Sequence, residues 1–406
     1  MRWSGLLLRF VPLLLGGGAA IAPLARALVL GGTAAAQTLP PADNPGWDNV
    51  VSPNGCSGVY LGNQWVLTAS HVGAGSVTLG STTYSVQPGS AVRLRTPAGT
   101  GDTDLTLFRL AADPGLPAIS LVSAPLPPHT SVTMIGCGCT RGDSVSYDSS
   151  WVGNGMPAQY TGYLWDTPAK SWGTNRIAGT ITADDGYGSI VASVIDFTFP
   201  GPGSDATTDE AQGALYDSGG AVFAKLGGSW QLAGIMVAVG TYAGQPASTA
   251  IFGNATYAME LATYRPQVEA VRALTTPYEI WQYDRFRGQA TTATGDPDGD
   301  GFTNLQEYAF GMNPLLGDAT GGPQTALANY ADGWALTVTY THNTAATDAQ
   351  IVVEVSSNLA DWQAGEGATA VVSTTARDGN LEQVIVRDLT TVSGAARRFL
   401  RVRVTK

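Results

Sequence analysis

Residues 65–71 read W-V-L-T-A-S-H, an apolar run that ends in a histidine. Residues 104–110 read D-L-T-L-F-R-L, in which an aspartate opens a second apolar run. Residues 216–223 read Y-D-S-G-G-A-V-F, with a serine in a glycine-flanked turn before a third. Short apolar runs bounded by turn residues predict strands. The three segments therefore predict a β fold that presents a histidine, an aspartate and a serine.

The chemistry of these three residue types explains their combination. A serine hydroxyl is a weak nucleophile at neutral pH and needs a neutral imidazole to take its proton. A buried carboxylate fixes the imidazole tautomer and stabilises the imidazolium that forms. Because the chain has only three histidines, few other bases are available. We predict that Ser218 is the nucleophile, His71 the general base and then acid, and Asp104 the residue that orients the imidazole.

These motifs resemble those of the chymotrypsin-like (trypsin-like) serine peptidases, whose triad follows the same chain order. T-A-S-H is similar to the family's T-A-A-H, and D-S-G-G at residues 217–220 is its serine motif. The resemblance covers about residues 50–275. It implies a mainly β fold of two packed six-stranded barrels with a C-terminal helix. It also implies peptide-bond hydrolysis through an acyl-enzyme, without a catalytic cofactor.

The resemblance implies an oxyanion hole formed by the backbone N–H groups of Ser218 and Tyr216. The family has glycine where this chain has Tyr216, and a side chain there disfavours the required geometry. Loss of one such donor costs on the order of 10²–10³ in turnover. A catalytically silent homologue that acts as a calcium-dependent extracellular or surface binding protein is therefore the alternative.

The specificity pocket is placed by the same resemblance at Gln212, Val237 and Val239. Trypsin-like members have an aspartate where this chain has Gln212, and the family's S-W-G pocket edge is V-A-V here. Without a buried anion, a preference for lysine or arginine is not expected. We predict that the pocket accepts a neutral or apolar side chain of a protein or peptide substrate.

The N-terminal segment predicts export. Arg2 and Arg9 precede an apolar stretch, residues 10–23, that is too short to span a bilayer as a helix. Residues 25–27 read A-R-A and residues 34–36 read A-A-A, which are two cleavage-site candidates. The pattern predicts a signal peptide over residues 1–27, and hence a secreted, periplasmic or cell-surface bacterial protein with no later transmembrane segment.

Residues 29–33, V-L-G-G-T, resemble the I-V-G-G N-terminus of activated family members. In the family, that new amine pairs with the aspartate preceding the serine, which is Asp217 here. We hypothesise that cleavage after Ala27 leaves an amine near Asp217. A mature chain that starts at Gln37 would exclude this hypothesis, and many bacterial members use no such pairing.

Residues 296–307 read D-P-D-G-D-G-F-T-N-L-Q-E and match the twelve-residue EF-hand loop. The stretch also resembles thrombospondin type 3-like and dockerin-like calcium motifs. Dockerins carry two copies, so a cohesin partner is not expected from this single copy. The alternative is a solvated acidic turn. We predict a structural calcium ion that stiffens the linker, held by Asp296, Asp298, Asp300, Phe302, Asn304 and Glu307.

Four regions follow from the changes in pattern along the chain. A helix is predicted over residues 257–274 and a short one over residues 304–310. Trp334 and Tyr340 belong to an alternating run in the tail, which predicts a small antiparallel β-sandwich. The regions are a signal peptide (1–27), a protease domain (28–275), a linker with the calcium loop (276–324) and a C-terminal β module (325–406).

The overall composition restricts the function classes. Of 406 residues only 13% are charged, the net charge is −11, and three residues are lysine. Such a chain is a poor nucleic-acid binder, since phosphate contacts need clustered cations. Cys56, Cys137 and Cys139 are predicted to be buried thiols with at most one disulfide. The tail contains no catalytic cluster, and a cell-surface or polymer partner for it stays open.

Overall fold

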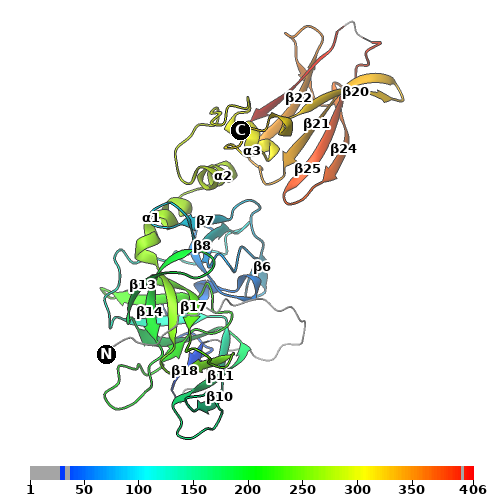
Figure 1. Cartoon of the computed structure of the whole chain (residues 1–406). Helices are drawn as coiled ribbons and strands as arrows, with labels where there is room; N and C mark the ends of the chain where they lie inside the picture. Colours follow the sequence, from blue (N-terminus) through cyan, green and yellow to red (C-terminus); the bar gives the residue numbers. More distant parts are fainter. Residues whose placement is uncertain (1–27, 33–36, 395–396) are drawn as a thin grey trace. The chain divides into compact units, whose positions relative to one another are not determined.

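The computed structural model describes residues 28–32, 37–394 and 397–406 (Figure 1). The predicted signal peptide and the second cleavage candidate at residues 34–36 lie outside the described residues. Two compact units are present. Unit 1 holds the described residues up to Val86 together with Ala91–Arg272, and unit 2 holds Gln87–Ser90 and Ala273–Lys406. Within the described ranges, no helix is long and apolar enough to cross a membrane.

Unit 1 is built on two large antiparallel sheets. The first has five strands in the order β2-β3-β4-β8-β7 and the second has seven in the order β12-β9-β16-β17-β19-β14-β13. The two sheets therefore differ from the expected six strands each, because short pairs such as β1-β15 and β5-β6 form separate ladders. The strands of the first sheet are β2 (Val50–Val51), β3 (Gly58–Gly62), β4 (Trp65–Thr68), β7 (Val92–Arg95) and β8 (Asp102–Arg109).

The second sheet and its neighbours complete unit 1. Its strands are β9 (Ser131–Gly136), β12 (Ser171–Arg176), β13 (Gly179–Asp184), β14 (Ser189–Asp196), β16 (Ala221–Leu226), β17 (Ser229–Gly240) and β19 (Ala255–Glu260). A three-stranded sheet contains β10 (Cys139–Tyr147), β11 (Tyr160–Pro168) and β18 (Thr249–Ile251). The short pairs are β1 (Val29–Leu30) with β15 (Ala211–Gln212), and β5 (Val77–Leu79) with β6 (Thr82–Tyr84).

The apolar runs read from the sequence form the cores under these sheets. Every residue of β4 is fully buried, which explains why this strand is apolar on both faces. Beneath the first sheet Tyr60, Val66 and Phe108 pack in one cluster, and Met134 and Ile195 belong to a separate cluster under the second. His71 therefore follows a buried strand of the first sheet, and Asp104 lies within another strand of that sheet.

The helix predicted over residues 257–274 is shorter than expected. Helix α1 spans Leu261–Arg272, and the residues before it belong to β19. Met259 pairs with Ala192 on one side and Ile235 on the other. The ladder hydrogen bonds on both sides of β19 fix these residues as a strand, although the spacing of their apolar side chains also suits a helix.

Unit 2 begins with two helices and ends in a sandwich of two sheets. Helix α2 (Pro277–Phe286) was not predicted, whereas α3 (Asn304–Phe310) has the predicted bounds. Val338, Val353 and Val384 belong to the core between the sheets. The sheets contain β20 (Gln324–Tyr330), β21 (Gly333–Asn343), β25 (Leu381–Asp388) and β24 (Thr369–Ala376), and β23 (Gln363–Ala364), β22 (Gln350–Ser356) and β26 (Phe399–Thr405).

One residue of the predicted apolar face in the tail is exposed. Trp334 is 53% exposed, whereas Val338 and Tyr340 of the same strand are buried. Trp334 pairs with Asn329 one step from the β20–β21 turn, so it lies at the end of the strand. The mainly β class is confirmed, with antiparallel sheets in both units.

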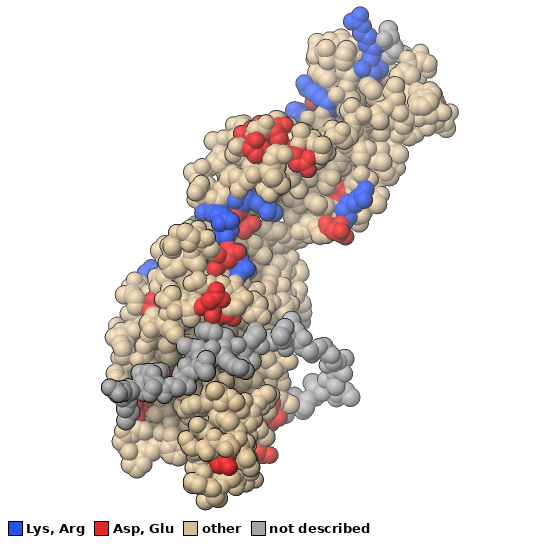
Figure 2. Space-filling model, viewed as in Figure 1, with Lys and Arg blue, Asp and Glu red and all other residues tan. Residues whose placement is uncertain are grey.

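The surface reflects the low charge content of the sequence. Figure 2 shows mostly uncharged side chains, with acidic groups gathered on the surface of unit 2. Asp296, Asp298 and Asp300 of the predicted calcium loop form an acidic cluster in that unit. Charge is therefore concentrated locally rather than spread evenly over the molecule.

Candidate active site

His71 and Asp104 meet in unit 1. His71 follows β4 and Asp104 lies in β8, and these two strands are paired in the first sheet. Nδ1 of His71 is 2.7 Å from Oδ2 of Asp104, and the backbone N–H of His71 donates to Oδ1 at 3.0 Å. The Asp104 side chain is fully buried and that of His71 is 6% exposed. A carboxylate can only accept, so Nδ1 carries the proton and Nε2 of the neutral ring is free to act as a base.

Ser218 lies in the turn before β16 and faces the first sheet. Its backbone C=O accepts a hydrogen bond from Ser57 N–H at 2.9 Å, next to β3. Its hydroxyl is 3.4 Å from the carbonyl of Val237, and Nε2 of His71 is buried without a hydrogen-bond partner in the described part of the chain. The serine–imidazole hydrogen bond is thus not formed here. Such bonds are often long or absent before substrate binds.

Gly219 shows why glycine must follow the nucleophile. Its φ is +86°, and a Cβ built there would lie 1.8 Å from the carbonyl oxygen of Ser57. No side chain fits in that space. Gly219 thereby lets the serine turn approach the strand that leads towards His71.

Tyr216 adopts a backbone conformation that usually belongs to glycine. Its φ is +73°, in the left-handed region that costs about 1–2 kcal/mol for a residue with a side chain. The ring is partly buried against a cluster that includes Phe197 and Ala250. Among the described residues, the N–H groups of Tyr216 and Ser218 donate to no backbone carbonyl. Both predicted oxyanion donors are therefore available despite the side chain.

Asp217 is buried between the nucleophile turn and the N-terminal strand. It accepts hydrogen bonds from the backbone N–H groups of Gly138 at 2.8 Å and Ala214 at 2.9 Å, and from that of Leu28. Burial raises its pKa to about 7, although these donors lower it in part. At Gly136 a Cβ would lie 2.0 Å from Oδ1 of Asp217. The G-C-G stretch at residues 136–138 therefore serves to pack against this carboxyl group.

The three predicted pocket residues are all buried. Gln212 lies in β15, paired with Val29, and neither its amide oxygen nor its amide nitrogen has a hydrogen-bond partner in the described ranges. Val237 and Val239 alternate along β17 and are 4% and 3% exposed. Since the Ser218 hydroxyl approaches the carbonyl of Val237, this strand passes beside the nucleophile.

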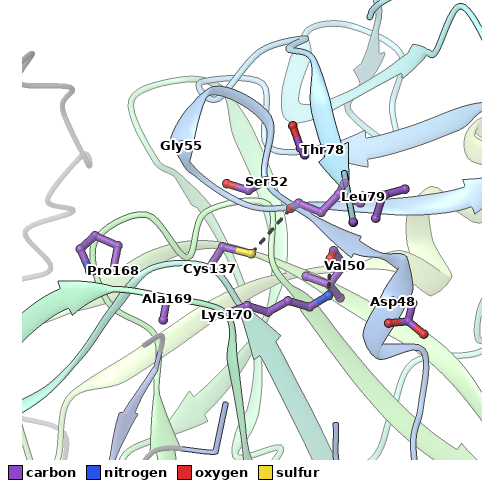
Figure 3. Close-up of a pocket in the computed structure, with 12 residues that line it drawn as sticks. Asp48, Val50, Ser52, Gly55, Thr78, Leu79, Cys137, Pro168, Ala169 and Lys170 are labelled. Atoms are coloured by element: carbon purple, nitrogen blue, oxygen red, sulfur yellow. Dashed lines mark hydrogen bonds between the residues drawn. The ribbon is translucent and has the colours of Figure 1, made fainter. Parts of the chain in front are cut away.

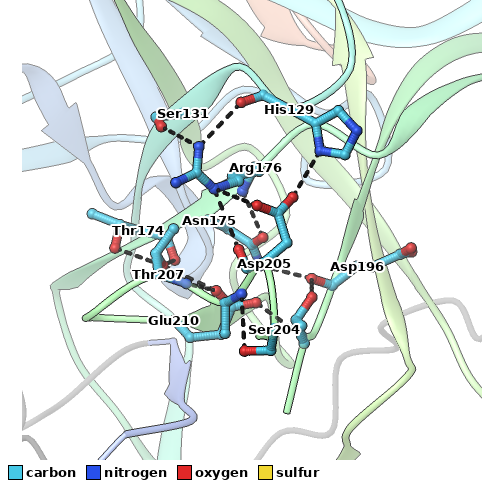
Figure 4. Close-up of polar contacts among 12 residues, drawn as sticks. His129, Ser131, Thr174, Asn175, Arg176, Asp196, Ser204, Asp205, Thr207 and Glu210 are labelled. Carbon is cyan, nitrogen blue, oxygen red and sulfur yellow. Dashed lines mark hydrogen bonds and ion pairs between the residues drawn. The ribbon is translucent and has the colours of Figure 1, made fainter. Parts of the chain in front are cut away.

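A polar network fixes the segment that precedes Gln212. The Asn175 amide nitrogen donates to the carbonyls of Asp196 at 3.0 Å and Ala211 at 2.8 Å. Glu210 accepts from the backbone N–H groups of Thr198 and Thr207, both at 2.8 Å. Figure 4 shows how Asp205 joins the network through Arg176 and His129. These contacts position β15 without lending a charge to Gln212.

Two comparisons bear on this arrangement. Residues 41–160 match the trypsin family. This trypsin-type match includes His71 and Asp104 and ends before Ser218. A mutant of human heparin binding protein (CAP37) is a similar solved structure, with 14% identity, a TM-score of 0.35, and coverage of 56% of this chain and 92% of that chain. A likeness of this degree carries no information about activity. No curated protein matches the chain.

A cavity of about 480 Å³ lies near the candidate site (Figure 3). Its wall includes Cys137, whose N–H donates to the Ser57 hydroxyl at 2.8 Å, and that hydroxyl donates to the carbonyl of Tyr216 at 3.1 Å. Lys170 donates to the carbonyl of Val50 at 2.7 Å, and burial lowers its pKa. The cavity is lined by Asp48, Val50, Val51, Ser52, Gly55, Thr78, Leu79, Gly80, Cys137, Pro168, Ala169 and Lys170.

The three cysteines are free thiols. Burial raises the pKa of Cys56 to about 11 and those of Cys137 and Cys139 to about 12, and the charge of nearby Asp217 adds to the effect. All three belong to the neighbourhood of the nucleophile turn. Their role in this structure is packing.

The predicted calcium loop brings its aspartates together. Carboxylate oxygens of Asp296, Asp298 and Asp300 lie within 4.8 Å of one another. The two oxygens of Asp296 accept from the N–H groups of Gly299 at 2.9 Å and Gly301 at 3.0 Å. These bonds curl the loop around its first ligand position, as the EF-hand pattern requires.

Glu307 and Asn304 both keep buried side-chain oxygens without a hydrogen-bond partner among the described residues. Glu307 is fully buried and neither carboxylate oxygen has a hydrogen-bond partner among the described residues. Burial and the three aspartates raise its pKa to about 8. The Asn304 amide nitrogen donates to Thr291 and Thr292 of the linker. Phe302 has its ring against the sandwich core. The orphaned Glu307 carboxylate therefore fits a cation best.

Two further residues at the site were not predicted. The ring of Tyr187 stacks on that of His71, with centroids 4.8 Å apart and an angle of 28°. Asp185 lies beside Asp104 and is 6% exposed. Both belong to the D-D-G-Y-G turn at residues 184–188, which reads as an ordinary hairpin turn. No spacing rule connects that turn to His71 or Asp104, which lie far earlier in the chain.

Proposed function

We propose that this protein is a serine endopeptidase with Ser218 as nucleophile, His71 as general base and Asp104 as its orienting group. The observation that carries the proposal is the double hydrogen bond between His71 and a fully buried Asp104. A surface ion pair would not hold both the backbone and the ring of one histidine. With Nδ1 held by Asp104, Nε2 of His71 has no hydrogen-bond partner among the described residues and can serve as the base.

The reaction follows from the positions of these groups. As Ser218 Oγ attacks the substrate carbonyl carbon, its proton moves to Nε2 of His71. The N–H groups of Tyr216 and Ser218 stabilise the oxyanion. Nε2 then gives the proton to the departing amine, which leaves an ester on Ser218. Water repeats the sequence and releases the second product, while Asp104 stays ionised throughout.

Gln212 supports a preference for an uncharged polar side chain next to the cleaved bond. Both polar atoms of its amide are buried without partners, and an unsatisfied buried group costs about 1–3 kcal/mol. A substrate side chain with an amide or hydroxyl group satisfies them, whereas a purely apolar one leaves them unpaired. A peptide-library digest tests this preference, and Gln212→Asp is expected to shift cleavage towards lysine and arginine.

Activation by an N-terminal amine is proposed for the exported chain. The N–H of Leu28 donates to Asp217, a carboxyl group whose other donors are also backbone N–H groups. Cleavage after Ala27 would turn that N–H into an ammonium group and supply the missing positive charge. N-terminal sequencing of the secreted protein tests the idea, since a chain starting at Gln37 lacks Leu28.

A structural calcium ion in unit 2 is the second part of the proposal. Asp296, Asp298, Asp300 and Glu307 would hold it, because carboxylate oxygens are the ligands that calcium prefers and Glu307 has no other partner. The ion would neutralise a cluster that otherwise repels itself. At the millimolar calcium found outside cells, even a weak site of this type is filled. The N-terminal pattern places the protein in that compartment, as a secreted, periplasmic or cell-surface protein.

Active-site labelling tests the enzymatic proposal directly. The full-length protein is treated with a serine-directed fluorophosphonate, with Ser218→Ala as the variant and Ser204→Ala, an exposed loop serine, as the matched control. We expect labelling of the wild type and of the control but not of Ser218→Ala. Equal, poor labelling of all three would support the alternative, a catalytically silent surface-binding homologue.

A further inference from the structure

The turn between β13 and β14 is anchored on the strand that carries Asp104. The Thr103 hydroxyl donates to the carbonyl of Ser189 at 2.9 Å. Arg93 of β7 donates to the carbonyls of Tyr187 and Thr103. At Gly188 a Cβ would lie 2.5 Å from the carbonyl oxygen of Asp102, so the turn approaches β8 as closely as a backbone can. This contact brings Tyr187 next to His71 and Asp185 close to Asp104.

Asp185 presents one oxygen to its own turn and keeps the other buried without a partner among the described residues. Oδ1 accepts the N–H groups of Tyr187 at 2.9 Å and Gly188 at 3.0 Å. Oδ2 is buried and receives no N–H or O–H donor from the described residues. Asp104 is the neighbouring carboxyl group whose charge acts on Asp185, so the two acidic side chains lie close together. Two carboxylates only accept, so this contact is attractive only if one of them holds a proton.

The proton belongs on Asp185 rather than on Asp104. Asp104 already accepts two hydrogen bonds from His71, both of which favour its charged form. Its lone pairs leave room for one more donor. Asp185 has only the two backbone donors, is 6% exposed and lies next to a negative charge. Burial and the charge of Asp104 raise the pKa of Asp185 to about 6.

We propose that Asp185 is a positioning residue of the triad, which in its protonated form donates a hydrogen bond from its carboxyl group to Asp104. The inference rests on the proposed function, in which Asp104 orients His71. The added donor holds the Asp104 carboxylate in place together with the two hydrogen bonds from His71. When Asp185 loses its proton, a second negative charge lies near the imidazole and favours the protonated, inactive ring. The ionisation of Asp185 thereby influences the pH at which the His71 imidazole becomes protonated.

The other groups around Asp185 do not replace it in this role. His71 and Asp104 are the partners already described. Tyr264 of α1 accepts a hydrogen bond from Thr103, and burial raises its pKa, so it stays neutral. The Arg93 guanidinium is 3.8 Å from Asp102 and bonds to backbone carbonyls. Asp184, the neighbour of Asp185 in the turn, is exposed and accepts from Gly186 N–H.

The test is the NMR titration of His71 in the full-length protein. With three histidines in the chain, the His71 signal is identified by its loss in His71→Gln. In Asp185→Asn the amide stays neutral and donates at every pH, so we expect the His71 titration midpoint to fall by about one pH unit. Asp184→Asn removes the same charge from the exposed neighbour and is expected to leave the midpoint unchanged.

Turnover gives a second readout. Asp185→Asn should extend activity to lower pH, whereas Asp185→Ala, which donates nothing, should lower kcat about tenfold with KM unchanged. An unchanged midpoint in Asp185→Asn, or an equal shift in Asp184→Asn, overturns the inference. The titration does not need turnover. A protein that shows the shift but does not label at Ser218 would refute the proposed function and leave the Asp185–Asp104 contact established.

Discussion

Asp104 in unit 1 and Glu307 in unit 2 are both buried carboxylates, but they differ in what compensates their negative charge. In unit 1, Asp104 is fully buried and its oxygens accept from the backbone and the ring of His71. In unit 2, Glu307 is equally buried, but none of the described residues donates to either oxygen. Its neighbours in the loop are three aspartates, Asp296, Asp298 and Asp300.

The difference teaches where each unit obtains its compensating charge. A buried carboxylate without donors or a counter-ion is expensive. Unit 1 supplies donors from its own chain, so its catalytic geometry is self-contained. In unit 2 the N–H groups of Gly299 and Gly301 donate to Asp296 and shape the loop. Glu307 receives no donor from the described residues, so a bound cation is expected to compensate its charge. The expected effects below test this contrast, starting from the largest.

Asp104→Asn should have the largest effect. The amide cannot hold the His71 ring in the tautomer that frees Nε2, so we expect kcat to fall about 10⁴-fold. The measurement is peptide hydrolysis together with calcium-dependent unfolding of unit 2, which should not change. A loss of less than tenfold would mean that Asp104 does not orient the base.

Removal of the cation should affect stability rather than turnover. With free calcium about 1,000-fold above Kd, chelation should lower the free energy of unfolding of unit 2 by about 4 kcal/mol. Glu307→Gln should abolish the calcium dependence of the melting temperature, and Glu366→Gln, an exposed glutamate of the same unit, is the control. If EDTA leaves the melting temperature of the wild type unchanged, Glu307 is not a calcium ligand.

Asp217 should give the stability of unit 1 a pH dependence. Burial raises its pKa to about 7, so its contribution is complete below about pH 4, its value in an unfolded chain. The contribution is lost as the pH rises through 7, by a few kcal/mol in total. Denaturant unfolding between pH 4 and 8 should show this slope in a chain that still carries residue 27.

The slope should become small in Asp217→Asn, which does not ionise. It should also shrink in a chain that begins at Leu28, because the free amine pairs with the ionised carboxylate. A processed chain with the same slope as the unprocessed one would contradict the proposed pairing and leave Asp217 compensated by backbone donors alone.

The smallest effect concerns the backbone beside Asp217. Tyr216→Gly and Tyr216→Ala both remove the ring, but only alanine keeps the penalty of the left-handed conformation at φ +73°. We expect the glycine variant to be more stable than the alanine variant by about 1 kcal/mol, as measured by denaturant unfolding. Turnover should stay within a few-fold of the wild type in both, since the N–H remains. A hundredfold loss would show that the ring itself takes part.

The paired strands and the pair His71–Asp104 could be predicted because their signals are local. An apolar run such as residues 65–71 can hardly be anything but a buried strand, and a histidine at its end has a fixed place relative to it. The helix α2 was not predicted, although a local signal for it is present in the sequence. Thr276 and Glu279 form a capping box with Pro277 at the first turn, a signal that the mixed composition of the segment obscured.

Other features could not be predicted because they depend on tertiary contacts. Met259 suits a helix by its spacing, yet its neighbours in the sheet make it a strand residue. Asp185 meets Asp104 only because Gly188 allows the β13–β14 turn to touch β8. In the calcium loop the pattern placed the aspartates together, but not the orientation of Asn304 towards Thr291 and Thr292.

The free thiols around the nucleophile turn have a practical consequence for labelling. With pKa values raised to about 11 or 12, Cys56, Cys137 and Cys139 stay protonated at pH 8, where maleimides and iodoacetamides modify thiolates. A cysteine introduced in the exposed β24–β25 turn, by Asp378→Cys, would therefore take a fluorophore alone. Spectroscopy of unit 2 with a single dye is then possible without replacing the three native cysteines.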